Sequence, residues 1–317
     1  MNLAIWLERT AVRHPNRQAI FLGSECLATY KEFWLAVCAL RSHLENEGIK
    51  PGDRVAVYMR NCPEYLIAFY GVWSIGAVIL PINSKLHTKE VGWILENAGC
   101  AYVLCEESSI SEINFPGVTV FNPKWQQFDS NIHIPPVKRS STDLAWLFYT
   151  SGTTGRPKGV MITHGMIKTM ALSYFADVDQ VHPSDTTLYA APMSHGAGLY
   201  SIMHVLAGAR HAIPVSGGFD EEEIFGLAET LQNVHMFAAP TMVKRLTTFS
   251  RKNGYDGDGI RTIVYAGGPM YLSDIIEAVE QFGSLFIQVY GQGECPMGIT
   301  VLPRFEVSDR DLSLIHI

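Results

Sequence analysis

Short apolar segments without charges alternate with longer segments of helical spacing along most of this 317-residue chain. Val55–Tyr58, for example, follows the turn-forming pair Pro51-Gly52 and precedes a helix whose first turn contains Pro63. Strands buried on both faces have this uninterrupted apolar character, and they occur mainly in parallel sheets that are covered by helices. The alternation therefore predicts an α/β fold with mostly parallel sheets.

The pattern weakens between residues 106 and 142, and we expect two layered sub-domains that meet near residue 170. The predicted strands are Val55–Tyr58, Val78–Leu80, Ala101–Leu104, Leu144–Tyr149, Thr187–Tyr189, His211–Val215, His235–Ala238, Thr262–Tyr265 and Leu285–Val289. The predicted helices are one that ends before Gly48, Pro63–Ser74, Thr88–Ala98 with Thr88 as its cap, Glu221–Leu231, Met242–Phe249 and Leu272–Phe282.

One uncharged segment, Tyr65–Ile82, reaches the 18 residues that a membrane-spanning helix needs. Gly71, Gly76 and Pro81 interrupt it, and its end, Val78–Leu80, is typical of a strand. We therefore predict a buried helix followed by a buried strand, and no integral membrane segment.

Charge and cysteine usage exclude two classes of partner. The chain has 24 Lys and Arg against 31 Asp and Glu, a formal net charge of −7, so nucleic acid is not expected as a partner. Its six cysteines are scattered and include no Cys-x-x-Cys pair. This usage disfavours a structural zinc site and predicts reduced thiols in a cytoplasmic protein.

A glycine- and hydroxyl-rich segment follows the predicted strand Leu144–Tyr149 directly. It reads Thr150-Ser151-Gly152-Thr153-Thr154-Gly155-Arg156-Pro157-Lys158-Gly159. Glycines allow several backbone N–H groups to converge on one anion, and a lysine supplies a mobile positive charge. The Walker pattern does not match, because Lys158 follows a proline and precedes a glycine. Composition alone leaves two interpretations open, a phosphate loop and a solvated hairpin tip.

With Tyr149 and Val160, this segment resembles the signature loop of the ANL adenylate-forming superfamily, which includes acyl-CoA synthetases, peptide-synthetase adenylation domains and beetle luciferases. The resemblance extends from about residue 3 to residue 301. It implies a layered αβαβα body of two similar sub-domains, residues 1–170 and 171–307. In that superfamily the loop binds the β- and γ-phosphates of ATP, which assigns ATP contacts to Thr150, Ser151, Gly152, Thr153, Thr154, Gly155 and Lys158.

Three further segments match the superfamily in order. Ala191-Pro192-Met193-Ser194-His195-Gly196 resembles the segment that borders the acyl pocket, and this makes His195 a candidate for gating the carboxylate site. Without the resemblance, a histidine beside glycines is equally a turn residue. Ala266-Gly267-Gly268-Pro269-Met270 resembles the turn that packs against adenine; taken alone, it is an ordinary strand-to-helix turn.

Tyr290-Gly291-Gln292-Gly293-Glu294 resembles the superfamily's Tyr-Gly-x-Thr-Glu motif. The resemblance implies that Tyr290 stacks on adenine, that Gly291 and Gln292 belong to the nucleotide site, and that Glu294 holds Mg²⁺, a role that suits a carboxylate oxygen. Gly293 replaces the usual threonine, so no threonine role is carried over. We therefore expect Lys158, His195 and Glu294 to serve the chemistry, with ATP, Mg²⁺ and CoA as cofactor and co-substrates.

Several expected superfamily features are missing. The chain contains neither the Thr-Gly-Asp segment that holds the ribose nor the hinge and C-terminal lid domain with its catalytic lysine. We infer a truncated chain with little complete ligase turnover, whose residues 308–317 form a tail that need not be native. In the superfamily the lid also closes the site against water, so we expect its absence to lower the rate of the reaction.

The segment Pro192–Gly196 also bears on the substrate. It carries no carboxylate, so a substrate ammonium would lack a counter-charge, and an apolar acid such as a fatty acid is expected instead of an amino acid. The alternatives are an adenylating enzyme for aryl or other carboxylates, and a non-catalytic nucleotide-binding fragment. The sequence predicts small-molecule partners and leaves the oligomeric state open.

Overall fold

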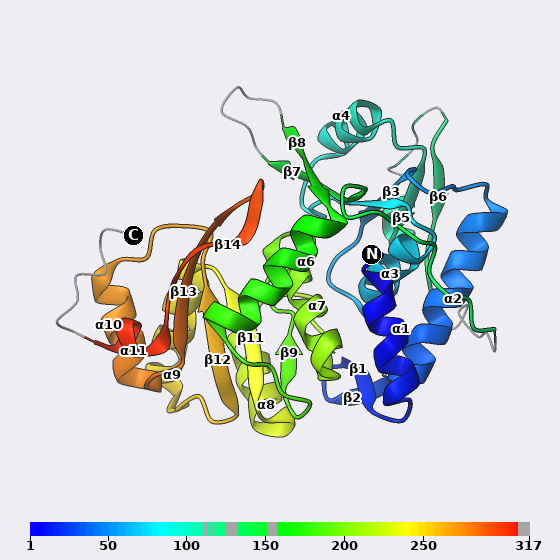
Figure 1. Ribbon diagram of the computed structural model, residues 1–317. Helices are drawn as coiled ribbons and strands as arrows, with labels where there is room; N and C mark the ends of the chain where they lie inside the picture. The colour runs from blue at the N-terminus through cyan, green and yellow to red at the C-terminus, as the bar shows by residue number, and fades with distance from the viewer. Residues whose placement is uncertain (111–112, 114, 116, 125–131, 151–156, 310–317) are drawn as a thin grey trace. The chain divides into compact units, whose positions relative to one another are not determined.

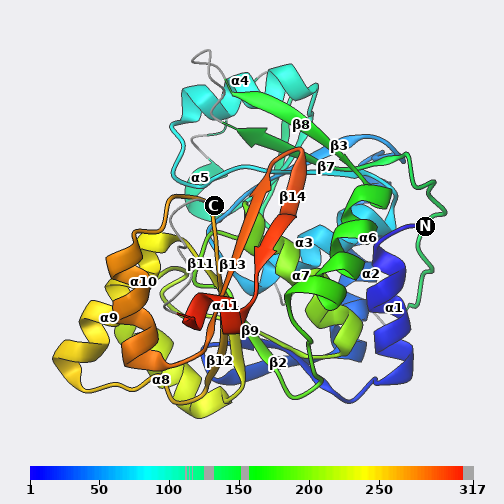
Figure 2. The same ribbon diagram turned by 60° about the vertical axis from the view of Figure 1, so that its left-hand side comes forward.

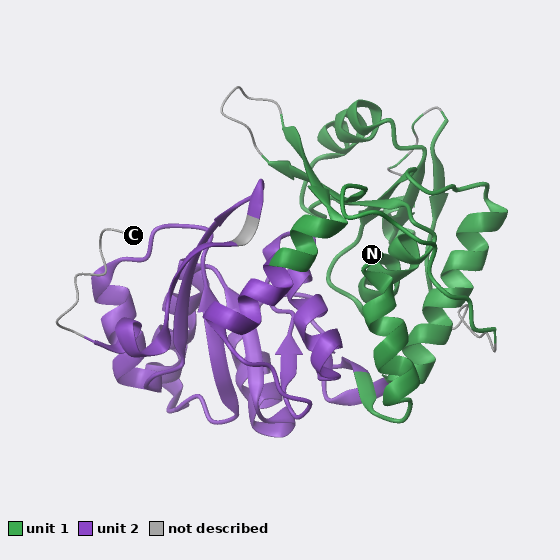
Figure 3. Ribbon diagram, viewed as in Figure 1, with its two compact units in different colours: residues 1–19, 28–169 green, residues 20–27, 170–317 purple. Residues whose placement is uncertain are grey.

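The computed structural model of the chain describes residues 1–110, 113, 115, 117–124, 132–150 and 157–309. They form two compact units, and each unit contains its own sheet. The first unit comprises residues 1–19 and 28–169, and the second comprises residues 20–27 and 170–317 (Figure 3). The second unit therefore takes a short segment from near the N-terminus, which the sequence pattern did not indicate.

The first unit contains a six-stranded sheet in the order β6-β5-β3-β4-β7-β8 (Figure 1). Its strands are β3 (Arg54–Tyr58), β4 (Val78–Pro81), β5 (Tyr102–Cys105), β6 (Thr119–Phe121), β7 (Leu144–Thr150) and β8 (Lys158–Thr163). Its helices are α1 (Ala4–Arg13), α2 (Tyr30–Asn46), α3 (Pro63–Ser74), α4 (Thr88–Ala98), α5 (Glu107–Ile110) and the first part of α6 (His164–Ser173). The pairs are parallel except β7 with β8.

Both faces of this sheet are covered, which explains the uninterrupted apolar strands. On one face, Phe69 of α3 stacks on Trp146 of β7 with ring centroids 5.0 Å apart, and Trp73 Nε1 donates to the Ala145 carbonyl at 2.8 Å. On the other face, α4 buries Ile94 and Leu95 against side chains of β3, β4 and β5. Strand β7 is therefore anchored by packing just before the candidate phosphate loop.

The second unit contains an eight-stranded sheet in the order β14-β13-β12-β11-β9-β10-β1-β2. Its strands are β9 (Thr186–Leu188), β10 (Arg210–Ile213), β11 (Val234–Ala238), β12 (Ile260–Tyr265), β13 (Phe286–Gln292), β14 (Cys295–Leu302) and the larger parts of β1 (Gln18–Leu22) and β2 (Glu25–Thr29). Its helices are a π-helical turn η2 (Tyr174–Val178), α7 (Gly196–Ala207), α8 (Glu221–Leu231), α9 (Pro240–Asn253), α10 (Leu272–Phe282) and α11 (Arg304–Ser308). Figure 2 shows the antiparallel β13–β14 pair side by side.

The two faces of this sheet have different chemistry. Alternate residues of a strand point to opposite faces, and Val234, Met236 and Ala238 of β11 pack with α8, α9 and α10 in an apolar core. The intervening residues, His235 and Phe237, contact Tyr200 of α7 instead. The face toward α7 therefore carries polar and aromatic groups within the core of the unit.

The predicted α/β class with mostly parallel sheets is confirmed. Each predicted strand overlaps an observed one, with bounds that differ by a few residues, and Tyr65–Ile82 is divided between the buried helix α3 and the buried strand β4. One detail was wrong: His87, not Thr88, caps α4. The His87 backbone is extended, so its Nδ1 accepts from the Lys89 N–H at 3.2 Å while the Glu90 carboxylate accepts from the His87 N–H.

Within the part of the chain that the structure describes, no helix has the length and apolar character needed to cross a membrane.

Candidate functional site

The candidate phosphate loop is flanked by the antiparallel strands β7 and β8. Thr150, the last residue of β7, pairs with Lys158, the first residue of β8. Lys158 is exposed, and no carboxylate of the described residues forms an ion pair with its ammonium group. A lysine in this position is available to an anion from solvent. The predicted loop residues Ser151, Gly152, Thr153, Thr154 and Gly155 lie outside the described residues.

In the second unit, strand direction brings the other predicted segments to one edge of the sheet. Strands β9, β11, β12 and β13 are adjacent and parallel, so their carboxyl ends meet at the same edge. The segments that contain His195, Pro240, Gly267 and Tyr290 lie at or beyond these carboxyl ends. Ligands of open α/β sheets bind at this edge, and here the sheet brings together four segments that are far apart in sequence.

His195 occupies the N-cap position of α7. Its Nδ1 lies 2.9 Å from the hydroxyl oxygen of Ser194, which is itself buried. Burial lowers the pKa of His195 below its ordinary value, so the ring is neutral at physiological pH. His195 therefore adds no positive charge at the start of α7.

An aromatic wall lies next to His195. A Cβ built on Gly196 would lie 4.0 Å from Cζ of Phe237, and the Phe237 ring lies 5.6 Å from that of Tyr200 between centroids. Phe237 is half-buried at the end of β11, whereas Tyr200 is fully buried in α7. This surface is uncharged, and it suits an apolar or aromatic ligand better than a charged one.

The predicted adenine turn follows β12. The Ala266 N–H donates to the Ala238 carbonyl at 3.2 Å, which joins this turn to the end of β11. Gly267 has a φ of 86°, and nothing lies within 4 Å of a Cβ built on it. The neighbouring Gly268 would meet only Pro240, at 3.9 Å. Together with Pro269, these residues leave an uncovered backbone surface against which a flat ring can lie.

Tyr290, Gly291 and Gln292 form the end of β13, and Glu294 lies in the two-residue turn to β14. Tyr290 is 42% exposed, and its hydroxyl accepts a hydrogen bond from Gln292 Nε2 at 2.9 Å. Glu294 is exposed, and the described residues contain no cluster of three or more His, Cys, Asp or Glu that could enclose a metal ion. One carboxylate still fits Mg²⁺, since this ion is commonly held by one or two carboxylates together with substrate phosphates and water.

A buried polar network behind the aromatic wall was not predicted from the sequence. The Tyr174 hydroxyl is hydrogen-bonded to His235 Nε2 at 2.5 Å, and the His235 ring lies 4.8 Å from that of His204. Asp179, directly after η2, accepts from Arg304 at 2.6 Å and from Thr262 at 2.7 Å. Because the hydrogen-bonded partners of this network are 61 to 125 residues apart in sequence, only the fold brings them together.

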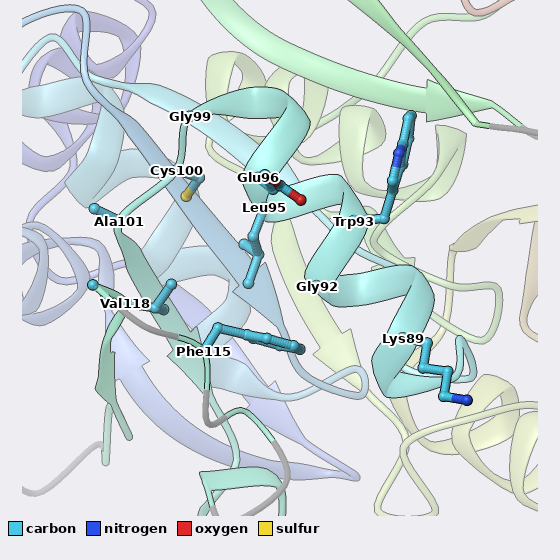
Figure 4. Close-up of a pocket in the computed structure, with 11 residues that line it drawn as sticks. Lys89, Gly92, Trp93, Leu95, Glu96, Gly99, Cys100, Ala101, Phe115 and Val118 are labelled. Carbon is cyan, nitrogen blue, oxygen red and sulfur yellow. The ribbon is translucent and has the colours of Figure 1, made fainter.

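A cavity of about 690 Å³ lies in the first unit beside α4 (Figure 4). Its walls include Gly92, Leu95, Cys100, Phe115 and Val118, with Lys89 and Glu96 at the rim. None of the residues predicted to bind ATP, Mg²⁺ or the acid lines it. We therefore do not assign it to the candidate site.

A family model described as AMP-binding enzyme matches residues 7–314. The chain belongs to this family. All of the predicted site residues lie within the match to the AMP-binding enzymes, and the recognition of the adenylate-forming superfamily is confirmed.

Relatives and solved structures agree with this membership. The chain is 28% identical over 312 residues to feruloyl-CoA synthase of Amycolatopsis sp, covering 97% of this chain and 62% of the relative. It is 27% identical over 304 residues to 2-succinylbenzoate–CoA ligase of Listeria innocua, covering 94% and 62% of the two chains. The structure of the N-terminal domain of FACL13 from Mycobacterium tuberculosis superposes with a TM-score of 0.86 at 26% identity, covering 97% of this chain and 80% of that one. This chain thus spans about three-fifths of the length of its curated AMP-binding relatives.

Proposed function

We propose that this chain contains the ATP- and acid-binding part of an AMP-forming acyl-CoA synthetase. The observation that carries the proposal is the edge of the sheet at which the carboxyl ends of β9, β11, β12 and β13 meet. An aromatic wall, an uncovered glycine turn, an exposed tyrosine and a carboxylate lie in the segments at this edge. The names of the relatives, which describe acid–CoA ligases, support the same reaction class.

The proposed first step joins the acid to AMP. A carboxylate oxygen of the acid attacks the α-phosphorus of ATP, the bond from that phosphorus to the bridging oxygen breaks, and pyrophosphate leaves with the electron pair. In this step Thr150 and Lys158 bind the β- and γ-phosphates, and the mobile charge of Lys158 offsets the negative charge on the leaving group. When bound, Mg²⁺ neutralises part of the phosphate charge, and Glu294 is its proposed protein ligand.

The second step transfers the acyl group. The thiol of CoA loses its proton and attacks the acyl carbonyl, and AMP leaves, so ATP, acid and CoA yield acyl-CoA, AMP and pyrophosphate. Tyr290 and the backbone of Gly267, Gly268 and Pro269 hold adenine throughout, with Gly291 and Gln292 beside them. His195 borders the carboxylate and, being neutral, orients it without forming a competing ion pair.

The proposed acid has an uncharged tail. The wall formed by Gly196 and Phe237, which the buried Tyr200 supports from behind, offers no carboxylate to an ammonium group, and burying an unpaired ammonium is costly. Fatty and aryl acids both fit this chemistry. A cytoplasmic location is also proposed, since none of the six cysteines, all of which are described, forms a disulfide.

The proposal is tested by ATP–pyrophosphate exchange, in which labelled pyrophosphate is incorporated into ATP only when an acid is activated reversibly. The purified chain is offered Mg²⁺, ATP and a panel of fatty acids, aryl acids and amino acids, with and without CoA. Exchange that depends on an acid with an uncharged tail supports the proposal. Exchange that is greatest with amino acids contradicts the proposed substrate class.

A further inference from the structure

Tyr149 is held at the end of β7 by helix α4. Its hydroxyl donates to Oδ1 of Asn97 at 2.7 Å, and its ring lies 6.1 Å, edge to face, from that of Trp93. Burial raises the pKa of Tyr149 above its ordinary value of 10.0, so the hydroxyl keeps its proton and donates throughout the physiological range. Two residues of α4 therefore act on the strand residue that immediately precedes Thr150.

The same tyrosine ring lies over the opposite strand. Tyr149 pairs with Gly159, and a Cβ built on Gly159 would lie 3.0 Å from Cζ and 3.2 Å from Oη of the ring. Such separations are tighter than nine in ten real Cβ contacts, so the ring would have to shift by a few tenths of an ångström to admit a larger residue at this position. Tyr149 thus contacts both strands, at the residue pair next to the pair formed by Thr150 and Lys158.

Helix α4 is a rigid support for these contacts. Val91, Ile94 and Leu95 of α4 are buried in the core of the unit, and near the C-terminus of the helix Arg54 Nε donates to the carbonyl of Ala98 at 2.8 Å. Figure 4 shows Trp93 extending from α4 away from Leu95 and Phe115, toward the ribbon of the β7–β8 pair. Asn97 lies one turn further along the helix, on the side of Trp93.

We propose that Asn97 is a positioning residue for the β- and γ-phosphates of ATP. It acts through Tyr149, whose fixed ring holds Thr150 and Lys158 in register, and it does not itself touch the nucleotide. The inference rests on the proposed function of the β7–β8 segment in binding ATP.

The test compares ATP with AMP, because AMP lacks the two phosphates concerned. Binding of each nucleotide to the full chain is measured calorimetrically with Mg²⁺ for the wild type and for Asn97→Leu, Tyr149→Phe and the double variant. We expect Asn97→Leu to weaken ATP binding roughly two- to tenfold, the loss typical of one hydrogen bond, and to leave AMP binding unchanged. Tyr149→Phe, which keeps the ring and removes only the hydroxyl, should have the same effect, and the double variant should be no worse than either.

Two further variants separate positioning from general damage to α4. Asn97→Asp keeps an oxygen that accepts the hydrogen bond, and it should keep the ratio of ATP affinity to AMP affinity at the wild-type value. Glu96→Leu changes a neighbouring exposed residue and should also leave this ratio unchanged. An unchanged ratio in Asn97→Leu, or equal losses for ATP and AMP, would overturn the positioning role alone. A wild-type chain that binds ATP no more tightly than AMP would overturn the proposed phosphate site itself.

Discussion

Thr150 and Lys158 face each other across the antiparallel β7–β8 pair, one position beyond the pair formed by Tyr149 and Gly159. Successive residues of a strand point to opposite faces, and cross-strand partners share a face. Tyr149 packs on the α4 side, so the side chains of Thr150 and Lys158 are directed away from that helix. The Thr150 hydroxyl and the Lys158 ammonium group therefore lie on one side of the strand pair, and helix α4, which holds Tyr149, lies on the other.

Lys158→Ala should weaken ATP binding roughly ten- to hundredfold, the range expected for loss of a charge-assisted contact. AMP binding should be retained, because Lys158 is proposed to contact the phosphates that AMP lacks. Calorimetric titration with both nucleotides provides the measurement, and Lys168→Ala, at an exposed lysine of α6, is the matched control. Equal ATP affinity in the two variants would remove Lys158 from the site.

Glu294→Gln should raise the Mg²⁺ concentration needed for half-maximal ATP binding roughly tenfold or more, because an amide replaces a charged ligand oxygen. Glu222→Gln, which changes another exposed glutamate in α8, should leave the Mg²⁺ dependence as it is. The dependence is measured by titrating Mg²⁺ at a fixed ATP concentration. A Glu294→Gln protein with the wild-type requirement would show that the ion is held without this carboxylate.

Phe237→Ala should change selectivity for the acid while leaving ATP affinity constant. Removing the ring opens the wall beside Gly196, so larger tails should bind better relative to small ones by roughly tenfold. Binding of acyl-sulfamoyl adenosines, which are stable mimics of acyl-adenylates, reports this selectivity when the tail is varied. Tail selectivity identical to that of the wild type would place the acid elsewhere.

Much of the fold follows from patterns within single segments. Strands such as β3 and β4 are covered on both faces, so their sequences are uninterrupted apolar runs. Strands β8 and β14 did not stand out, because they are antiparallel partners near the sheet edge with many exposed residues. Helix α7 was also missed, since it starts at Gly196 and is buried around most of its circumference, which leaves no amphipathic stripe to detect.

The candidate site was predictable where the motifs follow strands, because parallel strands place their carboxyl ends at a common edge. The segment around Phe237 is apolar, but the approach of its ring to Gly196 is visible only in the structure. Contacts such as Tyr174 with His235, and Tyr149 with Asn97, join residues more than 50 positions apart. No local pattern encodes such pairs, so they required the structure.

Asp179→Asn should lower the free energy of unfolding by about 2 kcal/mol. The carboxylate accepts from Arg304 and Thr262 and lies 3.2 Å from Arg261. The substitution removes the charge that pairs with Arg304, whereas Arg261 keeps its ion pair with Asp185 at 3.0 Å. The two arginine side chains are 27% and 24% exposed, so the loss is smaller than for a fully buried pair. Urea unfolding provides the measurement, with Asp177→Asn in the exposed part of η2 as the control; equal stability of the two variants would contradict this role.

The buried histidines should make the protein sensitive to acid. Burial lowers the pKa of His204 to about 4, and burial with nearby cationic groups holds the pKa of His235 well below its ordinary value of 6.5. The unfolded chain therefore binds more protons than the native protein below pH 6.5, so the stabilisation is complete above 6.5 and is lost as pH falls toward 4. His204 alone accounts for about 3 kcal/mol over this range.

Unfolding free energies measured by urea titration between pH 7.5 and pH 4.5 test this dependence. The His204→Leu protein should show a shallower decline than the wild type, because one buried titrating group is removed. A wild-type stability that does not fall below pH 6.5 would contradict the account of the buried network.

Binding of a stable acyl-adenylate mimic tests the central claim most directly, because it requires the nucleotide and acid sites to be joined in one protein and does not depend on turnover. The wild-type chain should bind an acyl-sulfamoyl adenosine with an uncharged tail roughly a hundredfold or more tightly than AMP, since the mimic engages both sites at once. A mimic that binds no more tightly than AMP, or a preference for a tail that carries an ammonium group, would contradict the account.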